Sequence, residues 1–171
     1  EPGGTPLGED IRQLLLSHRD DAMASETELL LMFAARAEHL AKVIIPSLKN
    51  GCWVISDRFT DATFAYQGGG RGIDFSRIAT LESWVQNELR PHMTFLLDAP
   101  VALALERAGK RSDPDRFEKE HGQFFEKVRT AYLDLATKFP ARYRVIDASQ
   151  SLEDVQNDIK VSLNMAISTW Q

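Results

Sequence analysis

Residues 52–72 read CWVISDRFTDATFAYQGGGRG, and this stretch decides the predicted fold. The apolar run 52–55 is typical of a short buried strand, which ends where Ser56, Asp57 and Arg58 begin a polar segment. In an open α/β sheet, ligands bind at the carboxyl ends of the strands. Asp57 and Arg58 are therefore predicted to lie at the mouth of a site, where Asp57 suits a metal ion or its water and Arg58 suits an anion.

The polar residues after this pair suit the recognition of a planar ligand. They are Thr60, Thr63, Tyr66 and Gln67, which supply two small hydroxyl groups, an aromatic ring and an amide. The glycines of 68–72 are predicted to let the backbone turn sharply or close over a ligand. They are not a dinucleotide fingerprint, because that motif follows a strand and opens a helix. An Asp-Arg pair by itself is also common as a surface ion pair.

Length and composition limit the class of protein. The chain has 171 residues and a net charge of −5, which predicts one domain over residues 1–171 and no general surface for nucleic acid. A phosphate site must then be a local cluster of arginines. Cys52 is the only cysteine, which excludes an internal disulfide and a cysteine-based zinc site. No apolar run approaches the roughly 18 residues of a membrane span, and we expect a cytoplasmic protein.

A long helix with an arginine in its apolar stretch is predicted over residues 25–49. Ser25 and Glu28 have the spacing of a capping box at its start, and most of its apolar stripe is core. Phe33 and Arg36 lie three residues apart on one side of this helix. An unpaired guanidinium is costly to bury, and a bound anion or carbonyl group relieves that cost.

The remaining pattern alternates helices with strands. Helices are predicted near 7–17, 75–89 and 101–108, around 124–135 and from about 152, and strands at 93–97 and 143–146. Together with the run described first, this predicts an α/β architecture with a mostly parallel sheet. Arg12 falls near the start of the first helix, where a site residue and a surface arginine are equally expected. Asp98 is explained by helix initiation before Pro100.

Four short motifs occur in order along the chain: EPGGTP at 1–6, FAAR at 33–36, DRF…AYQGGGRG at 57–72 and DRFE at 115–118. Together they resemble the bacterial thymidylate kinase family over nearly the whole chain. The resemblance implies a P-loop kinase-like parallel sheet flanked by helices, with a short basic lid at about 108–118. It also implies transfer of the γ-phosphoryl group of MgATP to dTMP, giving dTDP for dTTP biosynthesis. The family's GxxxxGK[ST] loop is not in this sequence, and we expect it upstream, with a strand, a helix and a second strand.

The resemblance further implies roles for individual residues. dTMP would be bound by Arg12, Phe33, Arg36, Arg58, Thr63, Tyr66 and Gln67, and ATP by Arg107, Arg111, Arg116 and Ala148. Catalysis would depend on Arg58, Arg111 and Asp57, with Asp57 holding Mg²⁺ directly or through water. Phe33 would stack on thymine, and Tyr66 would lie under the sugar, where it disfavours a 2′-hydroxyl.

Several alternatives stay open from the sequence. Some family members space the ring and the arginine by four residues, which would place Met32 rather than Phe33 against thymine. The chain could also be another P-loop nucleoside or nucleotide kinase, or an inactive nucleotide-binding or dimerisation module. Finally, the resemblance implies a homodimer and raises the question of whether the Glu1–Pro2 bond is cis.

Overall fold

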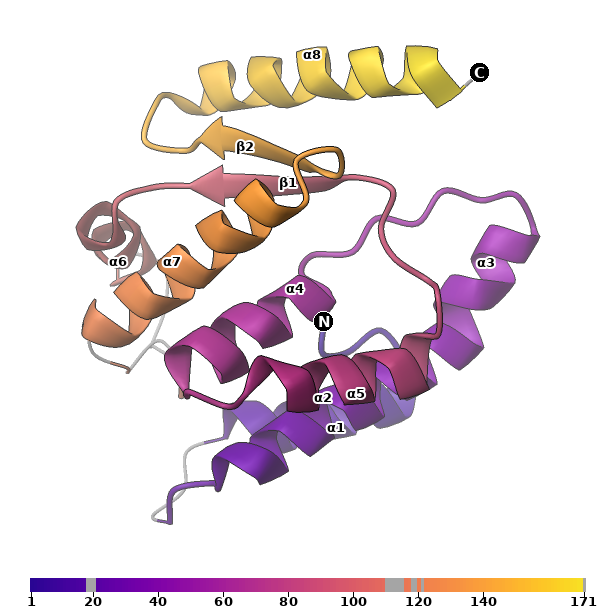
Figure 1. Cartoon of the computed structure of the whole chain (residues 1–171), viewed down its shortest axis with the longest axis vertical. Coiled ribbons are helices and arrows are strands. Elements are labelled where there is room, and N and C mark those ends of the chain that lie inside the picture. Colours follow the sequence, from indigo (N-terminus) through magenta and orange to yellow (C-terminus); the bar gives the residue numbers. More distant parts are fainter. Residues whose placement is uncertain (18–20, 110–115, 118–119, 121, 171) are drawn as a thin grey trace.

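The computed structural model describes residues 1–17, 21–109, 116–117, 120 and 122–170. Its helices are α1 (Pro6–Leu16), α2 (Ser25–His39), α3 (Ile45–Lys49), α4 (Thr60–Thr63), α5 (Phe75–Gln86), α6 (Val101–Gly109), α7 (Gly122–Lys138) and α8 (Leu152–Trp170). Two π-helical segments, η1 (Leu40–Ile44) and η2 (Phe64–Gly70), continue α2 and α4, and the strands are β1 (Thr94–Asp98) and β2 (Tyr143–Asp147). In Figure 1, α8 and α7 lie on either side of the strands, and α1, α2 and α5 lie farther away.

The two strands form a parallel pair. Thr94 lies opposite Tyr143, and Asp98 lies opposite Asp147. Parallel strands need a long crossover connection, and here α6 and α7 supply it. The predicted strands at 93–97 and 143–146 agree with these bounds to within one residue. The α/β architecture predicted from the sequence is therefore confirmed.

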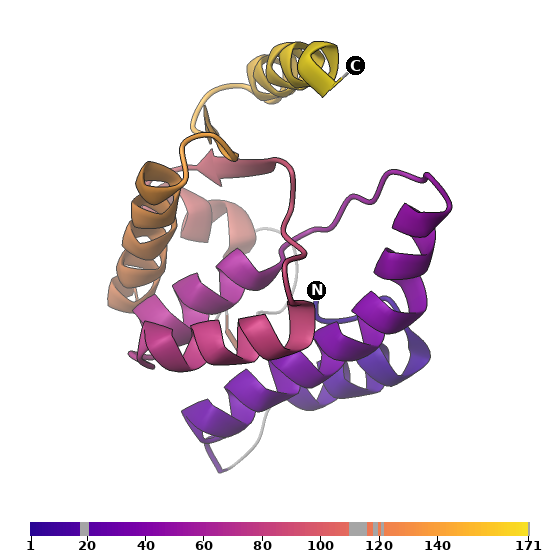
Figure 2. The ribbon, with the colours of Figure 1, turned by 45° about the vertical axis from the view of Figure 1, so that its right-hand side comes forward.

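The prediction of a buried strand at 52–55 is wrong. These residues form an extended connection from α3 to α4, which Figure 2 shows apart from the two strands. Trp53 is 66% exposed and Ile55 is 95% exposed. A strand forms when its backbone groups bond to a neighbouring strand, and within the described part of the chain the sheet contains only β1 and β2. Apolar composition cannot supply that neighbour.

The long helix predicted over residues 25–49 is confirmed, because α2, η1 and α3 follow one another without a break. The predicted capping box is wrong, since Ala24 occupies the N-cap position and makes no side-chain cap. Ser25 is the first helical residue. The carboxylate of Glu28 is instead buried, 1% exposed, and bonds to residues of other elements. Tertiary partners have overridden a local capping pattern.

The glycine run after Gln67 belongs to a packed helix. A Cβ atom at Gly69 would lie 2.7 Å from Cβ of Ala131, and one at Gly70 would lie 2.4 Å from Cε2 of Phe124. The absence of side chains lets η2 pack closely on α7. The prediction that these glycines close over a ligand is therefore wrong, and the predicted sharp turn comes only at Gly72, where φ is 79°.

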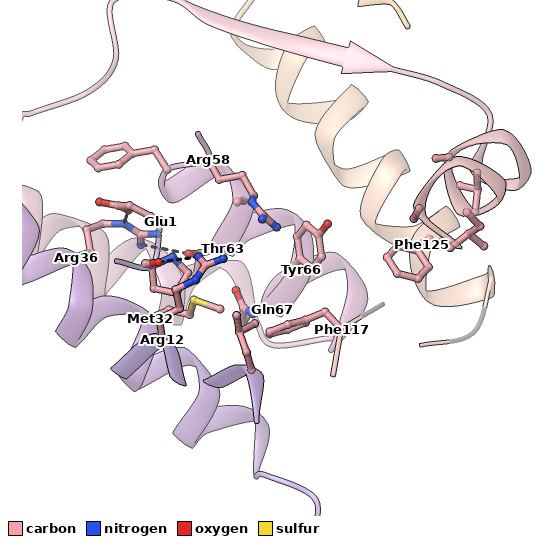
Figure 3. Close-up of a pocket in the computed structure, with 18 residues that line it drawn as sticks. Glu1, Arg12, Met32, Arg36, Arg58, Thr63, Tyr66, Gln67, Phe117 and Phe125 are labelled. Carbon is pink, nitrogen blue, oxygen red and sulfur yellow. Dashed lines mark hydrogen bonds and ion pairs between the residues drawn. The ribbon is translucent and has the colours of Figure 1, made fainter. Parts of the chain in front are cut away.

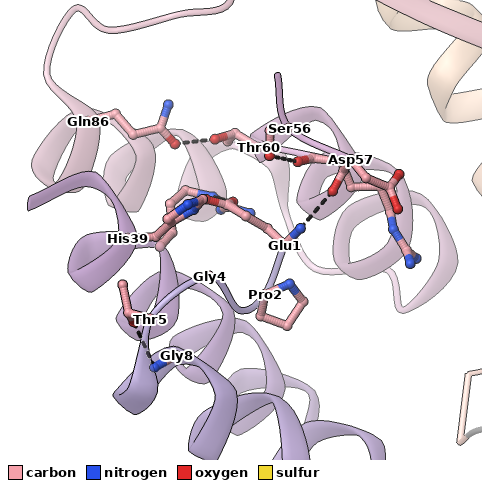
Figure 4. Close-up of polar contacts among 12 residues, drawn as sticks. Glu1, Pro2, Gly4, Thr5, Gly8, His39, Ser56, Asp57, Thr60 and Gln86 are labelled. Atoms are coloured by element: carbon pink, nitrogen blue, oxygen red, sulfur yellow. Dashed lines mark hydrogen bonds and ion pairs between the residues drawn. The ribbon is translucent and has the colours of Figure 1, made fainter. Parts of the chain in front are cut away.

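Small apolar clusters join the helices. They are Ile11, Leu15 and Ala35 between α1 and α2, Leu29, Phe33, Ile73 and Ile78 between α2 and α5, and Ala65, Phe124, Val128 and Ala131 between η2 and α7. A buried hydrogen bond from Oγ1 of Thr60 to Oε1 of Gln86 ties α4 to α5 (Figure 4). No helix among the described residues combines the length and the apolar character that crossing a membrane requires.

Candidate active site

A cavity of about 310 Å³ opens between α1, α2, η2 and α6 (Figure 3). The loop before α1, the turn before α4, α4 itself, Phe117 and Phe125 of α7 complete its wall. Six of the residues predicted to bind dTMP line this cavity: Arg12, Arg36, Arg58, Thr63, Tyr66 and Gln67. The fold thus gathers three guanidinium groups from three separate segments of an acidic chain, which is the local arginine cluster that the net charge requires for a phosphate site.

Arg36 enters the cavity from α2 in a fixed orientation. Its Nε donates to Oε2 of Glu1 at 2.7 Å, and its Nη1 donates to Oγ1 of Thr63 at 3.1 Å. Oε1 of Glu1 also contacts Nδ1 of His39 at 2.8 Å. The side chains of Arg36 and Glu1 are 3% and 2% exposed. The buried guanidinium group of Arg36 is therefore paired with Glu1 within the protein. A ligand would bind to a guanidinium group whose position is already fixed.

The loop before α1 is held against the cavity wall. The peptide bond between Glu1 and Pro2 is cis. The backbone nitrogen of Glu1 donates to the carbonyl oxygen of Asp57 at 2.6 Å, as Figure 4 shows. Nη1 of Arg12 donates to the carbonyl oxygen of Pro2 at 2.9 Å. These bonds keep Arg12 and the turn at Asp57 next to the same loop.

The turn before α4 directs Arg58 into the cavity. Arg58 has a φ of 65°, a left-handed conformation that costs a residue other than glycine about 1 kcal/mol or more. Oγ of Ser56 donates to the carbonyl oxygen of Arg58 at 2.7 Å and helps to hold this turn. Backbone strain of this kind persists where the surrounding structure imposes it, and it often marks a functional position.

Met32, and not Phe33, faces the cavity. Phe33 is 2% exposed and packs with Ile73 and Ile78 in the cluster between α2 and α5. Met32 lies on the cavity wall beside Arg36 (Figure 3). The prediction that Phe33 stacks on a base is therefore corrected in favour of the spacing of four. Successive residues of a helix point in directions about 100° apart. Met32 can therefore face the cavity while the next residue, Phe33, packs in the core.

Aromatic rings form another part of the wall. The Tyr66 ring makes edge contacts with Phe117, Phe124 and Tyr132, at centroid distances of 6.0, 6.1 and 6.4 Å. Burial raises the pKa of the Tyr132 hydroxyl, so this neighbour of Tyr66 stays uncharged at neutral pH. Phe117 and Phe125 also line the cavity, and the sequence did not predict them as site residues. Phe117 could have been found, because it belongs to the DRFE motif, whereas the helical spacing of Phe125 indicates core.

Comparison with known proteins identifies the family. The family model for thymidylate kinase matches residues 1–159. A thymidylate kinase of Pseudomonas putida (strain GB-1) is 59% identical over 163 residues, which are 95% of this chain and 78% of that protein. This chain belongs to the thymidylate kinase family. A thymidylate kinase of Cupriavidus pinatubonensis is 59% identical over 169 residues, 99% of this chain and 80% of that protein. The crystal structure of thymidylate kinase from Ehrlichia chaffeensis has a TM-score of 0.72 at 37% identity, covering 94% of this chain and 76% of that one.

A thymidylate kinase also needs a nucleotide-donor side, and two residues predicted for it lie together. Nη1 of Arg107 donates to the carbonyl oxygen of Ala148 at 2.6 Å, and Nη2 donates to that of Ser149 at 3.3 Å. These bonds join the end of α6 to the turn after β2. Arg111 lies outside the described residues, as does most of the predicted lid at 108–118.

Arg116, which is predicted to bind ATP, bonds to residues of α1 and α2 in this structure. Its Nη2 donates to Oε2 of Glu28 at 2.6 Å, and its Nε donates to the carbonyl oxygen of Leu15 at 2.8 Å. The side chain is 17% exposed and does not line the cavity. Arg116 therefore links its own segment to α1 and α2, and its role toward ATP stays a prediction. The sequence did not reveal this link, because Glu28 is 88 residues away.

Asp57 remains the candidate for a metal ligand in this thymidylate kinase. Its carboxylate is exposed beside the cavity and is not part of the wall. Among the described residues, no three carboxylate, histidine or cysteine side chains come together as a metal site. Mg²⁺ is usually held by one or two carboxylates together with substrate phosphates and water. A single exposed carboxylate near the arginines fits that mode of binding.

Proposed function

We propose that this protein phosphorylates dTMP to dTDP with MgATP as the donor, and that the arginine-lined cavity holds dTMP. The observation that carries the proposal is the convergence of Arg12, Arg36 and Arg58 on one cavity in a member of the thymidylate kinase family. The acceptor of the reaction is already a phosphate anion, so no covalent intermediate is needed. Positioning and neutralisation of charge then supply most of the rate enhancement.

The base and sugar would lie deeper in the same cavity. Thr63 and Gln67 would bond to the edge of thymine, and Met32 would contact its face in place of the Phe33 first predicted. A thioether is polarisable and packs well against aromatic rings. Tyr66 would lie under the sugar, where its ring leaves little room for a 2′-hydroxyl.

The donor would bind on the side of Arg107 and the turn at Ala148, with adenine against the Arg107 guanidinium. Arg111 would neutralise the transferred group, and Asp57 would hold Mg²⁺, which supplies positive charge at the phosphates. We further propose a homodimer in the cytoplasm. Exposed apolar residues of α2 such as Leu30, which is 56% exposed, support an interface.

Turnover on four deoxynucleoside monophosphates tests the proposed function. With MgATP, kcat/KM for dTMP should exceed that for dCMP and dAMP by about 100-fold or more, because a polar site rejects ligands that leave its groups unpaired. dUMP, which lacks only a methyl group, should fall between them. A preference for another nucleotide would indicate a related kinase, and binding without turnover would indicate an inactive module.

Arg58→Lys should lower kcat/KM for dTMP by about tenfold, equivalent to about 1.4 kcal/mol. The reason is geometric, since a planar fork of donors matches phosphate in a way that a lysine ammonium cannot. Steady-state kinetics at saturating ATP measures the effect. Arg90, an exposed arginine paired with Glu82 outside the cavity, provides the matched control Arg90→Lys. Equal kcat/KM values for parent and Arg58→Lys would remove Arg58 from the phosphate site.

A further inference from the structure

Glu28 is a buried charged residue to which the proposed function assigns no role. It lies in the first turn of α2, with its side chain 1% exposed. Oε1 accepts from Nε2 of Gln67 at 2.8 Å, and Oε2 accepts from Nη2 of Arg116 at 2.6 Å. Arg71 donates to both oxygens, at 3.4 and 3.3 Å. The carboxylate is thus held by two guanidinium groups and one amide.

These contacts leave the amide of Gln67 a single orientation. A carboxylate that receives hydrogen bonds from two guanidinium groups accepts and does not donate. Gln67 must therefore turn its NH₂ group toward Glu28, and its carbonyl Oε1 is the end that remains for a ligand. Gln67 is 1% exposed and lines the cavity (Figure 3), so a base bound there meets a fixed acceptor.

The orientation of the Gln67 amide matters because pyrimidine bases differ in the group that they carry at ring position 3. Thymine and uracil carry an N–H donor at ring position 3, whereas cytosine carries a lone pair there. An acceptor held opposite this position bonds to the first two bases and faces a second acceptor in cytosine. A site built to form a hydrogen bond strongly penalises a ligand that leaves the bond unmade.

We propose that Glu28 is a positioning residue that fixes the Gln67 amide and so makes the site select pyrimidines with an N–H at position 3. The proposal rests on the proposed function, because it needs the base of dTMP to lie in this cavity. Arg71 and Arg116 neutralise the buried carboxylate and hold its oxygens in place. Arg71 also pairs with Glu120 at 2.6 Å, so the same network links α2, the residue after η2 and the segment before α7.

Binding of dTMP, dUMP and dCMP to the full-length protein tests the proposal. In Glu28→Gln the new amide can present either end, so Gln67 is free to turn. Calorimetry should then show the Kd ratio of dCMP to dTMP fall by about tenfold or more. The ratio of dUMP to dTMP should stay within about twofold of the parent value, because both bases carry the same N–H. An unchanged ratio of dCMP to dTMP overturns the proposal.

Glu26 offers a matched control on the same helix. Its side chain is 55% exposed and pairs with Arg77 at 3.2 Å, outside the cavity. Glu26→Gln removes one charge from the same helical turn and should leave all three affinities unchanged. If Glu26→Gln changes the Kd ratio of dCMP to dTMP as much as Glu28→Gln does, the change comes from the lost charge on the helix and the proposal fails. A parent protein that does not bind dTMP contradicts the proposed function itself, which is a different result.

A double-variant cycle shows whether Glu28 acts through Gln67. Gln67→Met by itself should lower the Kd ratio of dCMP to dTMP. Adding Glu28→Gln to Gln67→Met should change that ratio by less than about twofold. A further tenfold fall in the double variant would mean that Glu28 acts by another route. Should Glu28→Gln not fold, Glu28→Asp keeps the charge for the arginines and draws the carboxylate away from Gln67. The Kd ratio of dCMP to dTMP should also fall in Glu28→Asp, and an unchanged ratio overturns the proposal.

Discussion

Replacing Arg36 by methionine is expected to lower the free energy of unfolding by about 3–5 kcal/mol. The substitution removes the guanidinium and leaves the carboxylate of Glu1, which is 2% exposed, beside the imidazole ring of His39. A buried charge that loses its partner keeps the cost of its desolvation and gains nothing in return. Denaturant unfolding followed by circular dichroism measures the change. dTMP affinity should also fall, because one of the three cavity arginines is gone.

Two controls separate this effect from the general loss of an arginine. Arg77→Met breaks the exposed pair with Glu26 and should cost less than about 1 kcal/mol. In the Arg36→Met background, Glu1→Gln removes the uncompensated charge and should restore a large part of the stability. A loss for Arg36→Met no greater than that for Arg77→Met would contradict a structural role for the Arg36–Glu1 pair.

Arg111→Ala should reduce kcat by about 10³-fold or more, the effect attributed to an arginine that meets a transferring phosphoryl group. The expectation rests on the position of Arg111 in the basic sequence before DPDRFE, on a lid that would close over ATP. dTMP dissociation should hardly change, because Arg12, Arg36 and Arg58 are the residues proposed to hold the acceptor. Single-turnover kinetics and dTMP titration of the full-length protein measure the two quantities.

The structure narrows the alternatives for this role. Arg116 already bonds to Glu28 and to the carbonyl oxygen of Leu15. This makes it a weaker candidate than Lys110 to take over the role of Arg111. If Arg111→Ala retains kcat within about threefold of the parent, the charge must come from another group, such as Lys110. Arg77→Ala, an exposed arginine on α5, should leave kcat unchanged and controls for the loss of positive charge.

Local sequence patterns correctly predicted the elements whose stabilising contacts lie close in sequence or repeat along the element. The helical period over residues 25–49 predicted the continuous helix, and the apolar runs near β1 and β2 predicted both strands to within one residue. The family resemblance also selected six of the eighteen residues that line the cavity, including Arg12, which bonds to the carbonyl oxygen of Pro2, ten residues away. In these cases the determining interactions are close in sequence or repeat with a helical period.

The sequence by itself determined the fold class, the family and the residue types of the site. The tertiary structure decided which side chains face that site. Met32 replaces Phe33 because the rotation of α2 depends on how its apolar face packs against α5. Glu28 forms no capping box, because its buried carboxylate pairs with the guanidinium group of Arg116, 88 residues along the chain. Such long-range pairing leaves no periodic signal in the sequence, since it depends on where the whole chain has placed the partner.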